Sequence, residues 1–235
     1  MKKLLLLMIV AFTSSIGYAQ KDKTYYSLVD ALKSPGKVYI LNLANTQMKE
    51  IPESISQFTN LKDLNLSGNQ LKAVPESIGK LVKLENLDLS KNQVAKLPES
   101  IGSLVLLKKL SLTKNKLTVL PEGITKLTVL TELSVGNNRL AKVPENIGKL
   151  MNLQKLYLNN NTLALLPEGI GKLKNLTVLE LQNNELVSLP KSIIRLKLLE
   201  TFIIQNNPDL VIPNEQQRFV KKYNPAETPK EKPKK

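Results

Sequence analysis

Few side chains in this sequence are suited to catalytic or metal chemistry. The 235 residues include no His and no Cys, which excludes disulfide bonds, thiol and imidazole catalysis and most zinc sites. Asp63 and Asp88 are the best candidates for a carboxylate pair, which would serve a calcium site or general acid–base work. No Asp-rich loop and no placed nucleophile accompany them. We therefore expect no enzyme, no metal site and no cofactor.

A column of basic residues recurs at multiples of 23 residues: Lys80, Lys126, Lys149, Lys172 and Arg195. Such a column is a possible track for phosphate groups. A glutamate stands four residues before each of the four lysines, which is the favourable spacing for an ion pair on an α-helix. We expect these glutamates to neutralise the column. Aromatic residues make up only 4% of the chain, so the stacking platforms of nucleic-acid sites are missing and no nucleic-acid partner is expected.

The elements that position these residues follow from an internal repeat. Asparagine recurs every 23 residues without slippage, and a proline ladder keeps the same period. The asparagines are Asn69, Asn92, Asn115, Asn138, Asn161, Asn184 and Asn207. The prolines are Pro52, Pro75, Pro98, Pro121, Pro144, Pro167, Pro190 and Pro213. Two ladders with one period predict a stack of identical supersecondary units.

Each period predicts one short strand and one short helical turn. Alternating leucines such as Leu64 and Leu66 place two side chains on one face of a strand. Pro75 and Glu76 suit the start of a helical turn. The asparagine turns the chain out of the strand, and we expect its amide to bond the backbone of the neighbouring turn, which is a structural role.

The frame L-x-x-L-x-L-x-x-N-x-L resembles the leucine-rich-repeat family, and the resemblance covers Val38 to Pro213. It implies an α/β solenoid, a horseshoe with a concave parallel sheet and short helical turns on the convex side. The 23-residue form is similar to repeats in Ras-associated scaffolds and in small exported bacterial proteins. The resemblance also implies a binding role, with the ligand on the residues between the leucines of the concave sheet.

Candidate ligand-binding residues are the outward-facing positions of the predicted strands. They are Asp63, Asp88, Lys109, Glu132, Lys155, Tyr157, Val178, Glu180 and Ile203. The last five form a patch with size and hydrophobicity near the C-terminal end, and interface hot spots favour tyrosine and apolar anchors. The alternative is that all nine are ordinary solvated sheet residues.

The chain divides into five predicted segments. The start has two lysines and an apolar run from Leu4 to Phe12 that is too short to span a bilayer. Tyr25, Leu28, Val29 and Leu32 have helical spacing. The segments are a signal peptide at 1–19, an N-terminal helical cap at 20–37, eight leucine-rich repeats at 38–213, a C-terminal cap helix at 214–223 and a disordered basic tail at 224–235.

These features predict an exported, non-enzymatic module that binds another protein, from a host or from the cell envelope. We expect a periplasmic, cell-surface or secreted monomer without a transmembrane segment once the signal peptide is removed. The formal net charge of +14 leaves an alternative open, in which an envelope-associated protein holds anionic glycolipid or glycan through its basic surface and tail.

Overall fold

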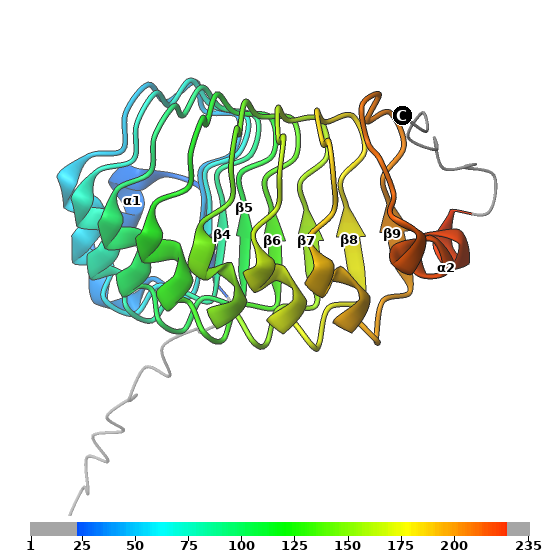
Figure 1. Cartoon of the computed structure of the whole chain (residues 1–235). Coiled ribbons are helices and arrows are strands. Elements are labelled where there is room, and N and C mark those ends of the chain that lie inside the picture. Colours follow the sequence, from blue (N-terminus) through cyan, green and yellow to red (C-terminus); the bar gives the residue numbers. More distant parts are fainter. Residues whose placement is uncertain (1–22, 225–235) are drawn as a thin grey trace, which may run out of the picture.

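The computed structural model describes residues 23–224. The signal peptide predicted at 1–19 lies outside the described residues, as does the predicted tail after Asn224. Nine parallel strands pair in sequence order and form one open sheet, and short helices line the other side of the solenoid (Figure 1). The predicted leucine-rich-repeat solenoid is therefore confirmed.

The strands are three residues long except for the first. They are β1 Thr24–Tyr25, β2 Ile40–Asn42, β3 Asp63–Asn65, β4 Asn86–Asp88, β5 Lys109–Ser111, β6 Glu132–Ser134, β7 Lys155–Tyr157, β8 Val178–Glu180 and β9 Thr201–Ile203. From β2 onward each residue pairs with the residue 23 positions ahead, as Asp63 does with Asn86. Because this offset equals the sequence period, residues that are 23 positions apart in the sequence lie side by side on neighbouring strands.

The helices on the opposite side are mostly 3-10 helices. They are η1 Pro35–Lys37, η2 Glu53–Gln57, η3 Glu76–Lys80, η4 Glu99–Ser103, η5 Glu122–Lys126, η6 Glu145–Lys149, η7 Glu168–Lys172 and η8 Lys191–Arg195. Successive turns pack closely, since a Cβ on Gly79 would lie 2.7 Å from the Ser100 carbonyl oxygen. Glycine recurs at the same position of the repeat at Gly102, Gly148 and Gly171, whereas Thr125 occupies it in η5. η5 and η6 pack less tightly on each other than the neighbouring 3-10 helices do.

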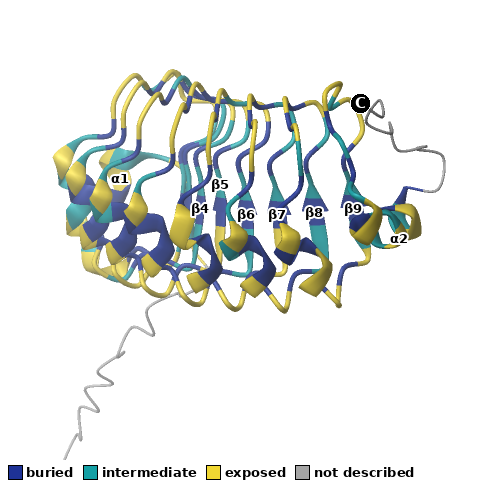
Figure 2. Ribbon diagram, in the orientation of Figure 1, coloured by how far each residue is buried: buried dark blue, intermediate teal, exposed yellow. Residues whose placement is uncertain are grey.

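An aliphatic core fills the space between the sheet and the 3-10 helices (Figure 2). The column asparagines form a polar ladder beside this core. Asn115, for example, is only 8% exposed. Its Nδ2 donates to the carbonyl oxygens of Leu89 at 2.9 Å and Leu112 at 3.0 Å. Its Oδ1 accepts a hydrogen bond from the backbone N–H of Val94 at 2.9 Å. The amide thus joins neighbouring repeats, because it satisfies buried backbone groups that have no strand partner.

Both ends of the solenoid are covered. The N-terminal helix α1 spans Leu28–Leu32 and is shorter than the predicted helix, which included Tyr25. Tyr25 lies in β1 instead, where it pairs with Leu41. The start of α1 is set by Ser27, whose Oγ accepts from the backbone N–H of Asp30 at 3.3 Å.

The C-terminal cover is α2, which spans Asn214–Tyr223. Phe219 and Tyr223 of α2 pack on Phe202 of β9, with ring centroids 5.6 Å and 6.1 Å away. The Tyr223 hydroxyl donates to the Leu199 carbonyl oxygen at 2.9 Å. An aromatic cluster therefore replaces the repeat that would otherwise follow β9.

Candidate concave binding face

The outward-facing side of the sheet carries all nine predicted site residues. In each strand from β2 to β9 the middle residue is buried, and its two neighbours are partly or fully exposed. The exposed positions form two regions. The first, here called the N-terminal hollow, lies over β1 to β6, and the second, the C-terminal patch, lies over β7 to β9.

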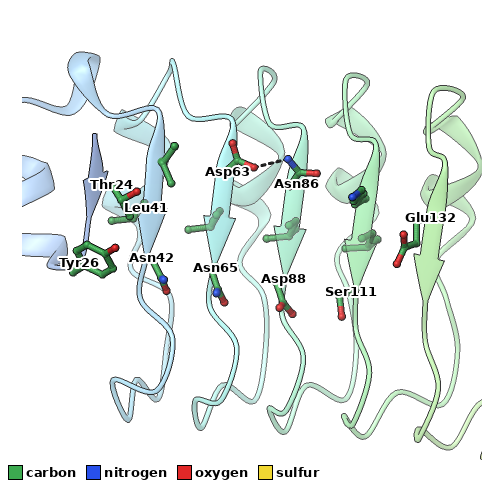
Figure 3. A pocket seen from close by; sticks show the side chains of 15 residues that line it. Thr24, Tyr26, Leu41, Asn42, Asp63, Asn65, Asn86, Asp88, Ser111 and Glu132 are labelled. Atoms are coloured by element: carbon green, nitrogen blue, oxygen red, sulfur yellow. Dashed lines mark hydrogen bonds between the residues drawn. The ribbon is translucent and has the colours of Figure 1, made fainter. Parts of the chain in front are cut away.

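The N-terminal hollow has a volume of about 540 Å³ and is open to solvent. Four of the predicted residues line it, together with Tyr26 and Asn86 (Figure 3). Those four are Asp63, Asp88, Lys109 and Glu132. Three carboxylates against one lysine make this hollow suited to a basic or hydrogen-bonding ligand.

Asp63 and Asp88 do not form the carboxylate pair considered from the sequence. Asp63 Oδ1 accepts a hydrogen bond from Asn86 Nδ2, whereas Asp88 Oδ1 accepts from the backbone N–H of Ser90 at 2.8 Å. The two carboxylates point to different ends of their strands (Figure 3). Among residues 23–224 no group of three or more acidic, His or Cys side chains is placed to hold a metal ion.

Two neighbours of Asp88 in the hollow are oriented as it is, by a hydrogen bond that the side chain accepts from the backbone N–H two positions ahead. The Oδ1 atoms of Asn42 and Asn65 accept from the backbone N–H groups of Ala44 at 3.1 Å and Ser67 at 2.9 Å. Asp88 and its two amide neighbours therefore form a row of fixed polar groups along the ends of β2, β3 and β4. A fixed row costs little side-chain entropy when a ligand binds.

The C-terminal patch brings together the five residues predicted for it: Lys155, Tyr157, Val178, Glu180 and Ile203. Tyr157 is the register partner of Glu180, and Glu180 is the partner of Ile203. Burial raises the pKa of the Tyr157 hydroxyl, and the carboxylates of Glu132 and Glu180 raise it further. The phenol therefore stays protonated and can donate a hydrogen bond to a ligand.

The ion pairs predicted for the basic column are not formed in the described residues. The three ion pairs of this part of the chain join Lys33 to Asp30 and Glu85 to two lysines, Lys62 and Lys108. The prediction assumed α-helical turns, in which residues four apart lie about 40° apart around the axis. In the observed 3-10 helices they lie about 120° apart, so glutamate and lysine diverge.

Two of the turn glutamates bond the next repeat instead. Glu99 Oε2 accepts from the backbone N–H of Gly123 at 2.7 Å, and the Glu168 carboxylate accepts from the N–H groups of Lys191 at 2.8 Å and Ser192 at 2.9 Å. Burial raises the pKa of Glu168, but the bonds from Ser192 and Lys191 outweigh it and lower the pKa overall. Of the glutamates that precede a column lysine, Glu168 is thus engaged by the next repeat and not by Lys172.

The residues missed by sequence reasoning belong to the N-terminal hollow. Thr24 and Tyr26 line it, and Tyr26 is 70% exposed. Because Tyr25 and Leu28 have the spacing of a helix, the strand β1 was not predicted. The only indication was the run of a β-branched and two aromatic residues from Thr24 to Tyr26, which favours extended backbone.

Two family models match the sequence: one described as a leucine rich repeat at residues 36–94 and 151–208, and one described as a leucine-rich repeat region at residues 76–160. None of the curated protein sequences is a match for this chain. No helix within residues 23–224 has the length and apolar character needed to cross a membrane.

Several solved structures are similar. A leucine-rich-repeat protein of Leptospira interrogans has 29% identity and a TM-score of 0.65 over 80% of this chain and 63% of its own. The plant peptide hormone receptor RGFR1, in complex with RGF2, has 28% identity and a TM-score of 0.67 over 74% of this chain and 28% of its own. The Arabidopsis receptor kinase HAESA, in complex with the peptide hormone IDA and the co-receptor SERK1, has 31% identity and a TM-score of 0.62 over 70% of this chain and 28% of its own. The chain thus spans less than two thirds of each of these structures.

Proposed function

Because this chain belongs to the leucine-rich-repeat family, we propose that it is a binding module that holds another protein on the concave face of its sheet. Proteins of this family commonly mediate protein–protein interaction. The similar receptors RGFR1 and HAESA are in complex with peptide hormones. Both points support a protein or peptide ligand.

The observation that carries this proposal is the C-terminal patch. Tyr157 is half-buried between neighbouring strands, so its ring is held in place while its hydroxyl can reach a ligand. Val178 and Ile203 supply apolar surface on the next two strands. A rigid aromatic residue next to apolar neighbours is the usual composition of an interface hot spot.

The N-terminal hollow adds specificity on the same face. Its carboxylates and fixed amides favour a partner segment that brings basic side chains and backbone N–H groups. A ligand that follows the strand order would therefore meet an acidic end at β2 to β6 and an apolar end at β7 to β9.

We further propose that the protein acts without catalysis and outside the cytoplasm. The absence of His and Cys from the sequence and the separate engagement of Asp63 and Asp88 support a non-enzymatic role. The lysines, apolar run and small residues of 1–19 support export. Mass spectrometry of the protein recovered from the cell envelope or the medium would check cleavage after Ala19.

Affinity capture tests the concave face. The purified protein, a Tyr157→Ala/Ile203→Asp variant and a Leu165→Ala/Val187→Asp control would be used as baits for host and envelope extracts at low and high salt. Leu165 and Val187 are 56% and 45% exposed and lie outside the strands. Circular dichroism would check that all three baits are folded.

We expect one protein to remain bound to the wild type and to the control at high salt, and at least tenfold less of it on the concave-face variant. Equal recovery on all three baits would contradict the proposal. A partner that vanishes at high salt from every bait would also contradict it, because apolar contacts tolerate salt that screens exposed charges.

A further inference from the structure

The positive charge of this protein is concentrated on one edge of the solenoid. We define the basic edge as the seven six-residue segments that run from the end of each 3-10 helix, from η2 to η8, to the strand that follows it: 57–62, 80–85, 103–108, 126–131, 149–154, 172–177 and 195–200. These connections follow the lower edge in Figure 1. They hold ten basic and two acidic residues, whereas the rest of residues 23–224 holds 17 basic and 15 acidic residues. Charge elsewhere is therefore nearly balanced.

The basic side chains of this edge are exposed, and most have no acidic partner. All ten are in the exposed class. Lys62 and Lys108 pair with Glu85, and Lys83 donates to Asn60 Oδ1 at 2.6 Å. Seven more make no ion pair with any described residue: Lys80, Lys126, Lys149, Lys172, Lys174, Arg195 and Lys197.

Five of these seven surround one groove on the outer side of η6, η7 and η8. Lys149, Lys172, Lys174, Arg195 and Lys197 line it, with Glu145 as the acidic residue among its lining. The groove has a volume of about 790 Å³. A concentration of cations in a concave site attracts anionic groups more strongly than the same charges spread over a flat surface.

The basic edge also carries exposed aliphatic side chains. Of the twelve large exposed hydrophobic residues in the described part of the chain, six lie on this edge: Val82, Val105, Leu106, Val129, Met151 and Leu198. Met151 is 65% exposed and lines the groove itself. Apolar side chains among lysines are the composition of surfaces that lie on an anionic bilayer, where the lysines meet phosphate groups and the apolar tips enter the acyl boundary.

We propose that the basic edge docks the protein on a bilayer whose surface carries anionic phospholipid. The edge extends over seven rows at about 5 Å each, or about 30 Å, so several cations meet the surface together. The contacts use no residue of the concave face, and the docking is therefore independent of the protein ligand proposed above. It also does not require the lysines beyond Asn224, which keep their charge in every variant below.

Vesicle co-sedimentation tests the charge contribution. The purified chain would be mixed with vesicles of phosphatidylcholine alone and of phosphatidylcholine with phosphatidylglycerol. The test variant is Lys149→Gln/Lys172→Gln/Arg195→Gln. The control variant, Lys72→Gln/Lys96→Gln/Lys142→Gln, removes the same charge from exposed lysines in the segments that lead from the strands into the 3-10 helices.

Each basic residue near an anionic surface contributes roughly a fivefold gain in partitioning, so the test variant should bind the anionic vesicles roughly a hundredfold more weakly. The control should lose less than about fivefold, because its lysines lie between a strand and the following 3-10 helix, outside the edge that meets the bilayer, and salt screens their attraction to it. An equal loss in both variants, no loss in either, or no binding of the wild type to anionic vesicles would overturn the proposal.

A single-tryptophan reporter tests the orientation directly. The chain has no Trp, so Met151→Trp and Leu165→Trp each introduce one fluorophore at an exposed position. With vesicles that contain brominated lipid, we expect quenching and a blue shift at position 151 and neither at position 165. Quenching at both positions, or at neither, would overturn the docking geometry.

The concave variant Tyr157→Ala/Ile203→Asp should bind vesicles as the wild type does. Its failure to capture a protein together with normal vesicle binding would support both proposals separately. Conversely, a concave variant that loses vesicle binding would overturn the assignment of docking to the basic edge.

Discussion

Replacement of one ladder asparagine by alanine should destabilise the protein far more than replacement of an exposed one. Asn115→Ala removes three hydrogen bonds, to the carbonyl oxygens of Leu89 and Leu112 and from the N–H of Val94. The carbonyl oxygens of Leu89 and Leu112 each keep a second hydrogen bond, from Asn92 and Asn138, so each bond lost there costs about 0.5–1.5 kcal/mol. Only the N–H of Val94 is left without a partner, at about 1–3 kcal/mol. Access of water near an 8% exposed side chain lowers these costs, and we expect a loss of about 2–4 kcal/mol in the free energy of unfolding.

The matched control is Asn152→Ala, which removes one exposed bond, from Asn152 Nδ2 to the Thr128 carbonyl oxygen at 2.7 Å. Its expected cost is about 0.5–1 kcal/mol. Asn115→Thr should fall between the two, because Thr46 occupies the same column and donates its hydroxyl to the Leu43 carbonyl oxygen at 2.9 Å.

Urea unfolding followed by circular dichroism measures these differences. Equal m-values would show that the same surface unfolds in each variant, which matters because the ends of a solenoid can unfold separately. If Asn115→Ala and Asn152→Ala agree within about 1 kcal/mol, the ladder does not hold the repeats together as argued.

Two further predictions concern packing and pH. Gly79→Ala should destabilise the protein by about 1–3 kcal/mol in urea unfolding, because the added Cβ would lie 2.7 Å from the Ser100 carbonyl oxygen. Gly36→Ala should be nearly neutral, because a Cβ at that position meets nothing within 4 Å. Equal losses of stability in the two variants would contradict the close packing of the 3-10 helices. Hydrogen bonds from Lys108 and Lys62 hold the pKa of Glu85 below its usual 4.5, so its stabilisation is present above pH 4.5 and is lost as the pH falls through the lowered pKa. Glu85→Gln should therefore cost up to about 1 kcal/mol at neutral pH and nothing once the pH is below both pKa values; a loss that persists in acid would refute the ion pairs as its cause.

The architecture was predictable because one sequence period sets both the strand register and the ladder. Leu64 and Leu87, 23 residues apart, are Cα partners in adjacent strands, so the outward-facing columns could be written down from the sequence. The five residues of the C-terminal patch were grouped correctly for the same reason. Their part in binding a ligand stays a prediction.

The parts that could not be predicted depend on backbone geometry within a single turn. A rule for residues four apart on an α-helix was applied to turns that proved to be 3-10 helices, and the expected ion pair between Glu168 and Lys172 is absent among the described residues. Similarly, the spacing of Tyr25 and Leu28 fits a helix, but pairing of Tyr25 with Leu41 extends the sheet instead. Local spacing cannot reveal a strand whose partner lies 16 residues ahead.

The two proposed surfaces occupy different positions of every repeat, and this has a geometric consequence. Each strand from β3 to β9 begins directly after a segment of the basic edge, so a protein docked by this edge would hold these strands pointing away from the bilayer, with the concave face open at the side. Because each repeat is packed on its neighbours by the core and the asparagine ladder, docking need not distort the concave face. Raising the salt concentration should therefore release the protein from vesicles, through screening of exposed lysines, while a ligand held by Tyr157 and Ile203 stays bound.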